Sequence, residues 1–275
     1  MTAQLASRLQ SGMNLPAQFR RAHRLPRLIA HIAWGVALVL TISNWRSAAQ
    51  WDRTISRWSA KLLRILGVRL TVIPSPQKID HAVLVANHIS WLDIFVIHAA
   101  RRVHFVSKSE VRRWPVAGWL AWKSGTLFIE RKRRADAFRI NQEIRSVLEQ
   151  GGWVAVFPEG TTSDGRQLRR FKPSLLQPAV DLGLPVIPAA VRYRHADDRP
   201  CDAVNYIDQI SMGESLWRIS GAPTIYSQLE FAPAISGDDR RDLARAAQTA
   251  VARMLGVPVM GMGPESGGDL QDAGP

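Results

Sequence analysis

Seven short apolar runs along the chain predict β-strands. The runs are largely apolar, and most have a glycine, proline or charged residue next to at least one end. Continuous apolar runs of this length are typical of strands that are buried on both faces of a sheet. The predicted strands run from Val68 to Ile73, Ala82 to Ala86, Val103 to Ser107, Thr126 to Glu130, Trp153 to Pro158, Pro185 to Arg192 and Thr224 to Phe231.

Segments with helical periodicity alternate with these strands. The clearest helices span Ala135 to Gln150, closed by two glycines, and Asp238 to Leu255, closed by Gly256. Strands that alternate with helices predict an α/β fold in which a mixed sheet is layered with helices. We expect one domain over residues 68–262. The glycine-rich and acidic tail, residues 263–275, is expected to be disordered.

The amino-terminal part differs from the rest. Residues 1–27 are polar and basic, and an apolar stretch of 18 residues follows from Leu28 to Trp45. That length is marginal for a membrane span, so a single crossing, a partly embedded helix and a cleaved signal peptide all stay open. From Trp51 to Gly67 apolar residues interleave with arginine and lysine, which predicts a cationic amphipathic helix. Residues 28–67 are therefore predicted to form a membrane-associated helical pair.

Composition narrows the class of protein. With 275 residues and 46% hydrophobic content, the chain can bury a substantial core, which argues against a mainly disordered protein. The net charge of +13 indicates an anionic partner such as anionic lipid, a phosphorylated substrate or nucleic acid. Several of the ten tryptophans lie beside arginines, as at a membrane interface. A single cysteine excludes an internal disulfide.

The first candidate for chemistry is the segment NHISWLD at residues 87–93, directly after a predicted strand. A histidine can take a proton from an alcohol near neutral pH, and a carboxylate can fix its tautomer, so His88 and Asp93 suit general-base catalysis. Five residues turn about 500° on a helix, so His88 must lie in the turn before the helix if the two side chains are to meet. The alternative is a capping box, with Ser90 as N-cap and Asp93 three residues later.

Three later segments also follow or form strands. Arg131 ends the run GTLFIER, where it can hold a phosphate or belong to a solvated charge run. The segment FPEGTTS follows at residues 157–163; Gly160 lets the backbone approach a ligand, and Glu159 with the hydroxyls can grip a polyol, although a simple turn would look the same. The fourth segment, LPVIPAAV at residues 184–191, predicts a buried strand with little chemistry.

Together, in this order, the four segments resemble the motifs of the glycerolipid acyltransferase family, whose best-known members make phosphatidic acid from lysophosphatidic acid. The resemblance covers about residues 80–195. It implies an α/β fold behind a helical membrane anchor. It also implies transfer of an acyl group from acyl-CoA or acyl carrier protein to a lysolipid hydroxyl, with no metal or other cofactor.

The same resemblance implies roles for individual residues. His88 would be the general base on the acceptor hydroxyl, and Asp93 would orient it. Lys108 matches a lysine common between the first two motifs and would support the thioester or its oxyanion. The residues implied in substrate binding are Lys108, Arg131, Glu159, Gly160 and Thr161.

The resemblance favours 1-acyl-glycerol-3-phosphate as the acceptor, but one position departs from the pattern. Members that handle phosphate usually carry arginine after the threonine of the third motif, whereas this chain has Thr162. Another lysolipid such as lyso-ornithine lipid is therefore the alternative acceptor. Two further alternatives are hydrolysis, with water as the acceptor, and a non-enzymatic protein that binds anionic lipid or nucleic acid.

The expected partners are a lysolipid, acyl-CoA or acyl carrier protein, and membrane lipid, with no nucleic acid. A basic leader ahead of an apolar stretch favours an amino terminus in the cytoplasm. We therefore expect a bacterial-type inner membrane protein with its active site at the cytoplasmic face.

Overall fold

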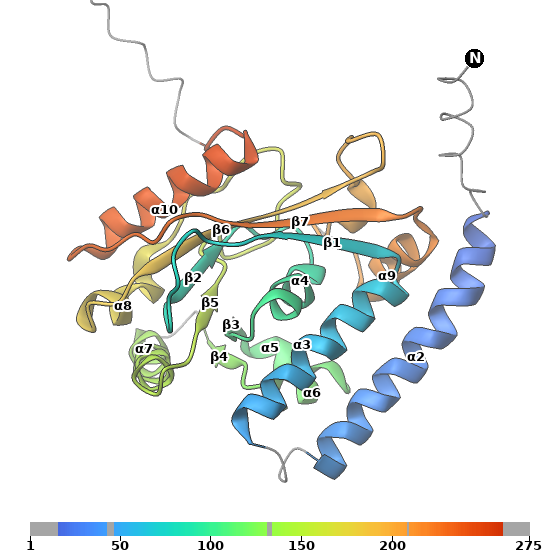
Figure 1. Ribbon diagram of the computed structural model, residues 1–275, viewed down its shortest axis with the longest axis horizontal. Helices are drawn as coiled ribbons and strands as arrows, with labels where there is room; N and C mark the ends of the chain where they lie inside the picture. Colours follow the sequence, from blue (N-terminus) through green and yellow to red (C-terminus); the bar gives the residue numbers. More distant parts are fainter. Residues whose placement is uncertain (1–15, 43–46, 131–133, 208, 261–275) are drawn as a thin grey trace, which may run out of the picture.

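The chain folds into a central β-sheet with helices on both faces (Figure 1). This computed structural model describes residues 16–42, 47–130, 134–207 and 209–260. The predicted binding residue Arg131 and the predicted disordered tail, residues 263–275, lie outside the described residues. The α/β class expected from the alternation of strands and helices is confirmed.

Within the described residues the sheet has seven strands, in the order β1-β7-β6-β2-β5-β3-β4. Neighbouring strands are parallel except β6 and β7, which are antiparallel. All seven predicted strands are present, with ends within two residues of the prediction. Their bounds are β1 Val68–Ile73, β2 Val83–Ala86, β3 His104–Lys108, β4 Leu127–Ile129, β5 Val154–Val156, β6 Val186–Arg194 and β7 Ile225–Phe231.

Helices cover the two faces of the sheet and create two hydrophobic cores. On β2, Leu84 and Ala86 face the core shared with α3, α4 and α9, whereas Val83 and Val85 face the core shared with α7, α8 and α10. This alternation explains why the strand is apolar at every position. The helices are α2 Ala17–Ile42, α3 Ala48–Ile65, α4 Leu92–Ala100, α5 Ser109–Arg112, α6 Ala117–Lys123, α7 Arg134–Glu149, α8 Gln177–Asp181, α9 Met212–Gly221 and α10 Arg240–Leu255, with 3-10 turns at Pro173–Leu175 and Asp202–Val204.

The first described helix, α2, begins eleven residues before the apolar stretch, so the boundary expected at residue 27 falls inside it. Its basic turn binds the carboxyl end of α9. Arg20 Nε donates to the Gly221 carbonyl at 2.8 Å, and Arg24 Nη1 donates to the Ala222 carbonyl at 2.7 Å. Helix ends leave carbonyls without partners, and the arginines supply them. The described part of the basic segment is therefore attached to the domain.

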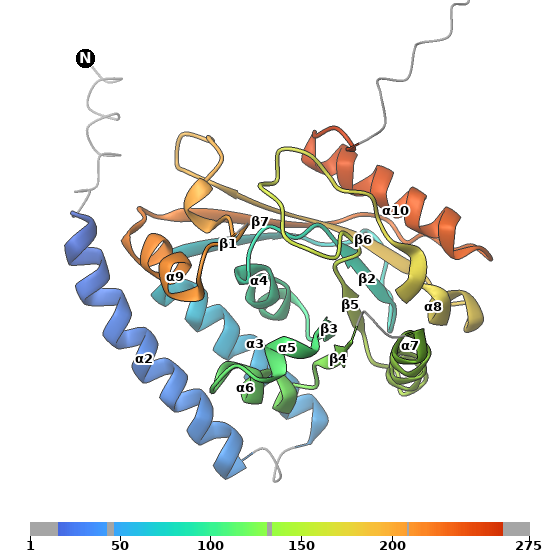
Figure 2. The same cartoon turned by 180° about the vertical axis from the view of Figure 1, so that it is seen from behind.

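The same helix lies along the outside of the molecule in both views (Figures 1 and 2). It packs against α3 and α9 and keeps Ile29, Trp34 and Leu40 exposed. Residues Ala17–Thr41 are long and apolar enough to cross a membrane by length and composition, although 28% of the most apolar window is buried in the fold. This helix is thus a weak candidate for a membrane span.

Candidate active site

The first predicted segment leaves the sheet at the carboxyl end of β2, where the side chain of Asn87 fixes its backbone. Asn87 Nδ2 donates to the Val191 carbonyl at 2.9 Å, and the Val191 N–H donates to Asn87 Oδ1 at 2.8 Å. The two bonds continue the contact between β2 and β6 beyond the last residue of β2. His88 therefore begins from a fixed position at the edge of the sheet, where open α/β sheets place their sites.

His88 and Asp93 meet as predicted. The distance from His88 Nδ1 to Asp93 Oδ2 is 2.8 Å; the Asp93 side chain is fully buried and that of His88 is 19% exposed. His88 lies in the turn before α4, which is the placement that the five-residue spacing requires. Because an ionised carboxylate only accepts, Nδ1 carries the proton and Nε2 keeps its lone pair. The ring is therefore in the tautomer that a general base needs.

The surroundings of Asp93 explain its fixed orientation. Its Oδ2 also accepts from the backbone N–H groups of Ile89 and Ser90, at 2.8 and 2.9 Å. Its Oδ1 accepts from the Tyr193 hydroxyl at 2.7 Å. Burial and the neighbouring Asp93 charge raise the pKa of Tyr193 well above its usual value, so the hydroxyl stays a donor. Asp93 thus receives four hydrogen bonds.

The capping-box alternative is confirmed for Asp93 but not for the Ser90 side chain. The Ser90 N–H donates to Asp93, as the acid of a capping box requires, but the buried Ser90 hydroxyl has no partner and Trp91 is the N-cap of α4. One oxygen of Asp93 therefore serves both the helix start and His88. The interaction with the histidine and the interaction with the start of the helix are therefore compatible, because both use the Asp93 carboxylate.

The third predicted segment follows β5 and closes on His88. Phe157 stacks on the imidazole, with ring centroids 4.0 Å apart and an angle of 8° between the planes. The Ser163 N–H donates to the His88 carbonyl at 2.8 Å, so the loop returns to the histidine. Between these contacts Gly160 has φ +79°, a conformation that glycine adopts without strain. Residues 157–163 therefore form one wall of the site.

Glu159 points inward. It is 4% exposed; its Oε1 accepts from the His88 N–H at 2.7 Å, and its Oε2 accepts from the Arg169 N–H at 3.1 Å. Both oxygens are occupied by backbone donors, so Glu159 holds the loop against His88. Of the predicted binding residues in this segment, Thr161 is the one whose side chain is exposed.

Burial raises the pKa of Glu159 to about 7, against 4.5 for an ordinary glutamate. Between these values the folded protein retains a proton that the unfolded chain has lost, so stability falls as pH rises. We expect Glu159 to remove up to roughly 3 kcal/mol of unfolding free energy across this window. Unfolding measured at several pH values should show this slope in wild type and in the surface control Glu149→Gln, but not in Glu159→Gln. An unchanged slope in Glu159→Gln would contradict the assignment.

One other predicted residue, Lys108, is not joined to this cluster. Lys108 is exposed at the carboxyl end of β3, which pairs with β5; no hydrogen bond or ion pair among the described residues links it to His88. Arg131 follows β4 outside the described residues. The structure also brings in Tyr193 and Phe157, to which the sequence assigned no role. Within the described residues no three His, Cys, Asp or Glu side chains gather in a way that could hold a metal ion.

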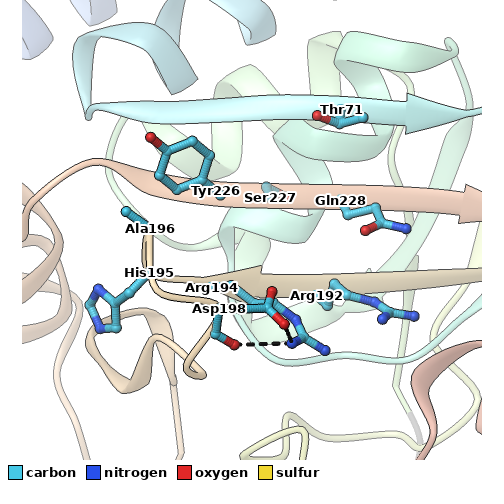
Figure 3. A pocket seen from close by; sticks show the side chains of 9 residues that line it. All are labelled: Thr71, Arg192, Arg194, His195, Ala196, Asp198, Tyr226, Ser227 and Gln228. Atoms are coloured by element: carbon cyan, nitrogen blue, oxygen red, sulfur yellow. Dashed lines mark hydrogen bonds and ion pairs between the residues drawn. The ribbon is translucent and has the colours of Figure 1, made fainter. Parts of the chain in front are cut away.

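One cavity lies on the sheet, and another lies beside the loop that closes on His88. The larger, about 360 Å³, is lined by residues of the neighbouring strands β1, β7 and β6 and of the loop after β6 (Figure 3). Its wall includes Arg192 and Arg194, which flank Tyr193 and so point to the face opposite Asp93. Asp198 accepts from Arg194 there at 2.5 Å. Of the predicted site residues that the structure describes, none lines this cavity. The smaller cavity, about 130 Å³, is lined by Ser163 and Arg169 of the loop that closes on His88.

Comparison with known proteins identifies the family of this chain. The family model described as Acyltransferase matches residues 70–192, which include His88, Asp93 and the segment from Phe157 to Ser163. The crystal structure of the 1-acyl-sn-glycerophosphate acyltransferase PlsC from Thermotoga maritima has the same fold. Its TM-score is 0.61 at 22% identity, over 86% of this chain and 96% of that chain.

Two curated relatives are more similar in sequence. The lyso-ornithine lipid O-acyltransferase of Pseudomonas aeruginosa is 36% identical over 87% of this chain and 95% of its own length. The 1-acyl-sn-glycerol-3-phosphate acyltransferase of Neisseria meningitidis is 34% identical over 69% of this chain and 75% of its own length. The chain therefore belongs to the lysolipid acyltransferase family, and it is an acyltransferase of lipid metabolism.

Proposed function

We propose that this enzyme transfers a fatty acyl group from acyl-CoA or acyl carrier protein to the free hydroxyl of a lysolipid, with His88 as the general base. The observation that carries the proposal is the 2.8 Å bond from His88 Nδ1 to the buried Asp93. That bond leaves Nε2 as the basic nitrogen, and no described residue hydrogen-bonds it. No cofactor is required, because the thioester is already activated.

The proposed reaction needs no covalent enzyme intermediate. His88 Nε2 takes the proton of the lysolipid hydroxyl while its oxygen attacks the thioester carbonyl. The tetrahedral intermediate collapses, the carbon–sulfur bond breaks, and His88 returns the proton to the leaving thiolate. Asp93 stabilises the imidazolium that exists between the two steps. Lys108, exposed at the end of β3, is proposed to support the thioester or its oxyanion.

For the acceptor, two observations favour lyso-ornithine lipid. The relative that this chain covers to 95% of its length is named for that lipid. In addition, Thr162 stands where phosphate-handling members usually have arginine, and its hydroxyl donates to the Tyr206 carbonyl within the protein. The acceptor that the sequence resemblance favoured, 1-acyl-glycerol-3-phosphate, is the second candidate, supported by the Neisseria relative.

We propose that α2 and α3 hold the enzyme on a bacterial-type inner membrane, with the active site at the cytoplasmic face. The outer side of α2 exposes Ile29, Trp34 and Leu40. The exposed side of α3 is cationic, which suits anionic headgroups. Its exposed cations are Arg53, Arg57, Lys61 and Arg64. The contacts of α2 with α9 would then fix the domain to the anchor.

One experiment tests the reaction and the acceptor together. Purified full-length enzyme receives labelled acyl-CoA or acyl carrier protein, with lyso-ornithine lipid, 1-acyl-glycerol-3-phosphate or no acceptor, and products are identified by mass spectrometry. We expect acylated lyso-ornithine lipid as the main product. If fatty acid were released at the same rate with and without an acceptor, the reaction would be hydrolysis and not acyl transfer. Acylation of 1-acyl-glycerol-3-phosphate alone would reverse the order of the two acceptors.

A further inference from the structure

The smaller cavity adjoins the catalytic loop. It measures about 130 Å³, which suits a small polar group better than an acyl chain. Its lining residues include Ser163, whose N–H donates to the His88 carbonyl, and Arg169, whose N–H donates to Glu159. The rest of the wall is Asp164, Gln167, Ile207 and Met260.

Two opposite charges line this cavity. Asp164 is half-buried, and its Oδ1 accepts from the Arg166 N–H at 3.1 Å. The Arg166 side chain lies 3.3 Å from Asp202, so it is already paired. Arg169, in contrast, is exposed; its side chain forms no ion pair with a described carboxylate within 4 Å, although its charge attracts that of Glu159. The cavity lining therefore offers one anionic and one cationic residue to a ligand.

We propose that this cavity binds the head group of the lysolipid acceptor, and that the head group carries both an anionic group and an ammonium. Arg169 binds the anion as a fork of N–H donors, and Asp164 binds the ammonium. The inference rests on the proposed function, since it names the substrate class of that site. A glycerol phosphate head offers only negative charge, so Asp164 repels it.

An ornithine head fits this pairing, because it combines a carboxylate with a basic amine. A phosphoethanolamine head also carries both charges, with phosphate as its anion. The shared chemistry is a zwitterion, and the acceptor panel has to separate the two sources. Gln167 and Ser163 add uncharged polar groups that suit either head.

The test compares wild-type enzyme with Asp164→Asn, using one acyl donor and three acceptors: lyso-ornithine lipid, lysophosphatidylethanolamine and 1-acyl-glycerol-3-phosphate. Asparagine keeps the Oδ1 acceptor for the Arg166 N–H but removes the charge. We expect kcat/KM for the preferred zwitterionic acceptor, relative to 1-acyl-glycerol-3-phosphate, to fall by about tenfold or more, the usual effect of losing one charged hydrogen bond. Arg169→Gln should weaken all three acceptors.

Matched controls are Asp238→Asn and Arg170→Gln, exposed residues that do not line the cavity; both should behave as wild type. A parallel fall for all acceptors in Asp164→Asn would mean that Asp164 only shapes the loop, and would overturn the inference. A wild-type preference for 1-acyl-glycerol-3-phosphate would overturn it and leave acyl transfer intact. Failure to acylate any acceptor would overturn the proposed function itself.

Discussion

Replacing His88 by alanine is expected to abolish acyl transfer while the protein stays folded. A positioned general base contributes about 10² to 10⁴-fold to a rate, so we expect kcat to fall roughly 10³-fold. The fold should survive because the contacts that fix this turn use backbone atoms. The His88 N–H donates to Glu159, and its carbonyl accepts from Ser163. Alanine retains both bonds.

The measurement is the initial rate of labelled lysolipid formation, together with the thermal midpoint of each variant. His195→Ala is the matched control, because His195 lines the larger cavity on the opposite face of the sheet (Figure 3). That control should keep wild-type activity. Substantial acyl transfer by His88→Ala would refute the base, and an equal loss in His195→Ala would show that the assay does not separate chemistry from folding.

The strands could be predicted because their signal is local. Residues buried on both faces leave a continuous apolar run, as at Val83–Ala86, whatever strand lies beside them. The order of the strands could not be predicted. β1, the first strand, pairs with β7, the last, so about 160 residues separate partners such as Val68 and Ile225. Nothing in either run specifies the other.

The docking of α2 on α9 was missed for a similar reason. Helix α9 itself carried a signal, since Ser211 caps it by accepting from the Glu214 N–H at 3.1 Å, and serine followed three residues later by glutamate is a helix-start pattern. The arginines of α2 carried none, because their partners are backbone carbonyls about 200 residues away. A basic segment reads the same in sequence whether it lies in solvent or caps a helix.

The meeting of His88 with Asp93 could be predicted from the sequence, but the contacts that support the pair could not. Tyr193 reaches Asp93 from 100 residues away, and Glu159 reaches the His88 N–H from 71. One signal was available for Tyr193. Alternate residues of a strand share a face, so Tyr193 had to point to the same side of β6 as Val191. Tyr193 lies two residues beyond the fourth segment, in the same strand β6, so a strand expected to carry little chemistry supplies a hydrogen bond to Asp93.

The network around Asp93 predicts that Asp93→Asn loses both activity and stability, unlike His88→Ala. Asp93 accepts from His88, from two backbone N–H groups and from Tyr193. An asparagine amide turns one –NH₂ group towards these donors, so at least one of them stays buried without an acceptor. We expect a loss of roughly 3 kcal/mol in unfolding free energy, and about a 10³-fold fall in kcat because the histidine tautomer is no longer fixed.

Tyr193→Phe provides the graded comparison for Asp93→Asn, because it removes one donor and keeps the ring. We expect about 1 kcal/mol of lost stability and a fall in kcat of about tenfold or less, with KM unchanged. Chemical denaturation and acyl-transfer rates measured on the same preparations give both quantities, with His88→Ala as the variant that loses activity alone. If Asp93→Asn were as stable as His88→Ala, the carboxylate would serve only the histidine. If Asp93→Asn lost stability but kept full activity, Asp93 would act only as a helix cap, and His88 would need another residue to fix its tautomer.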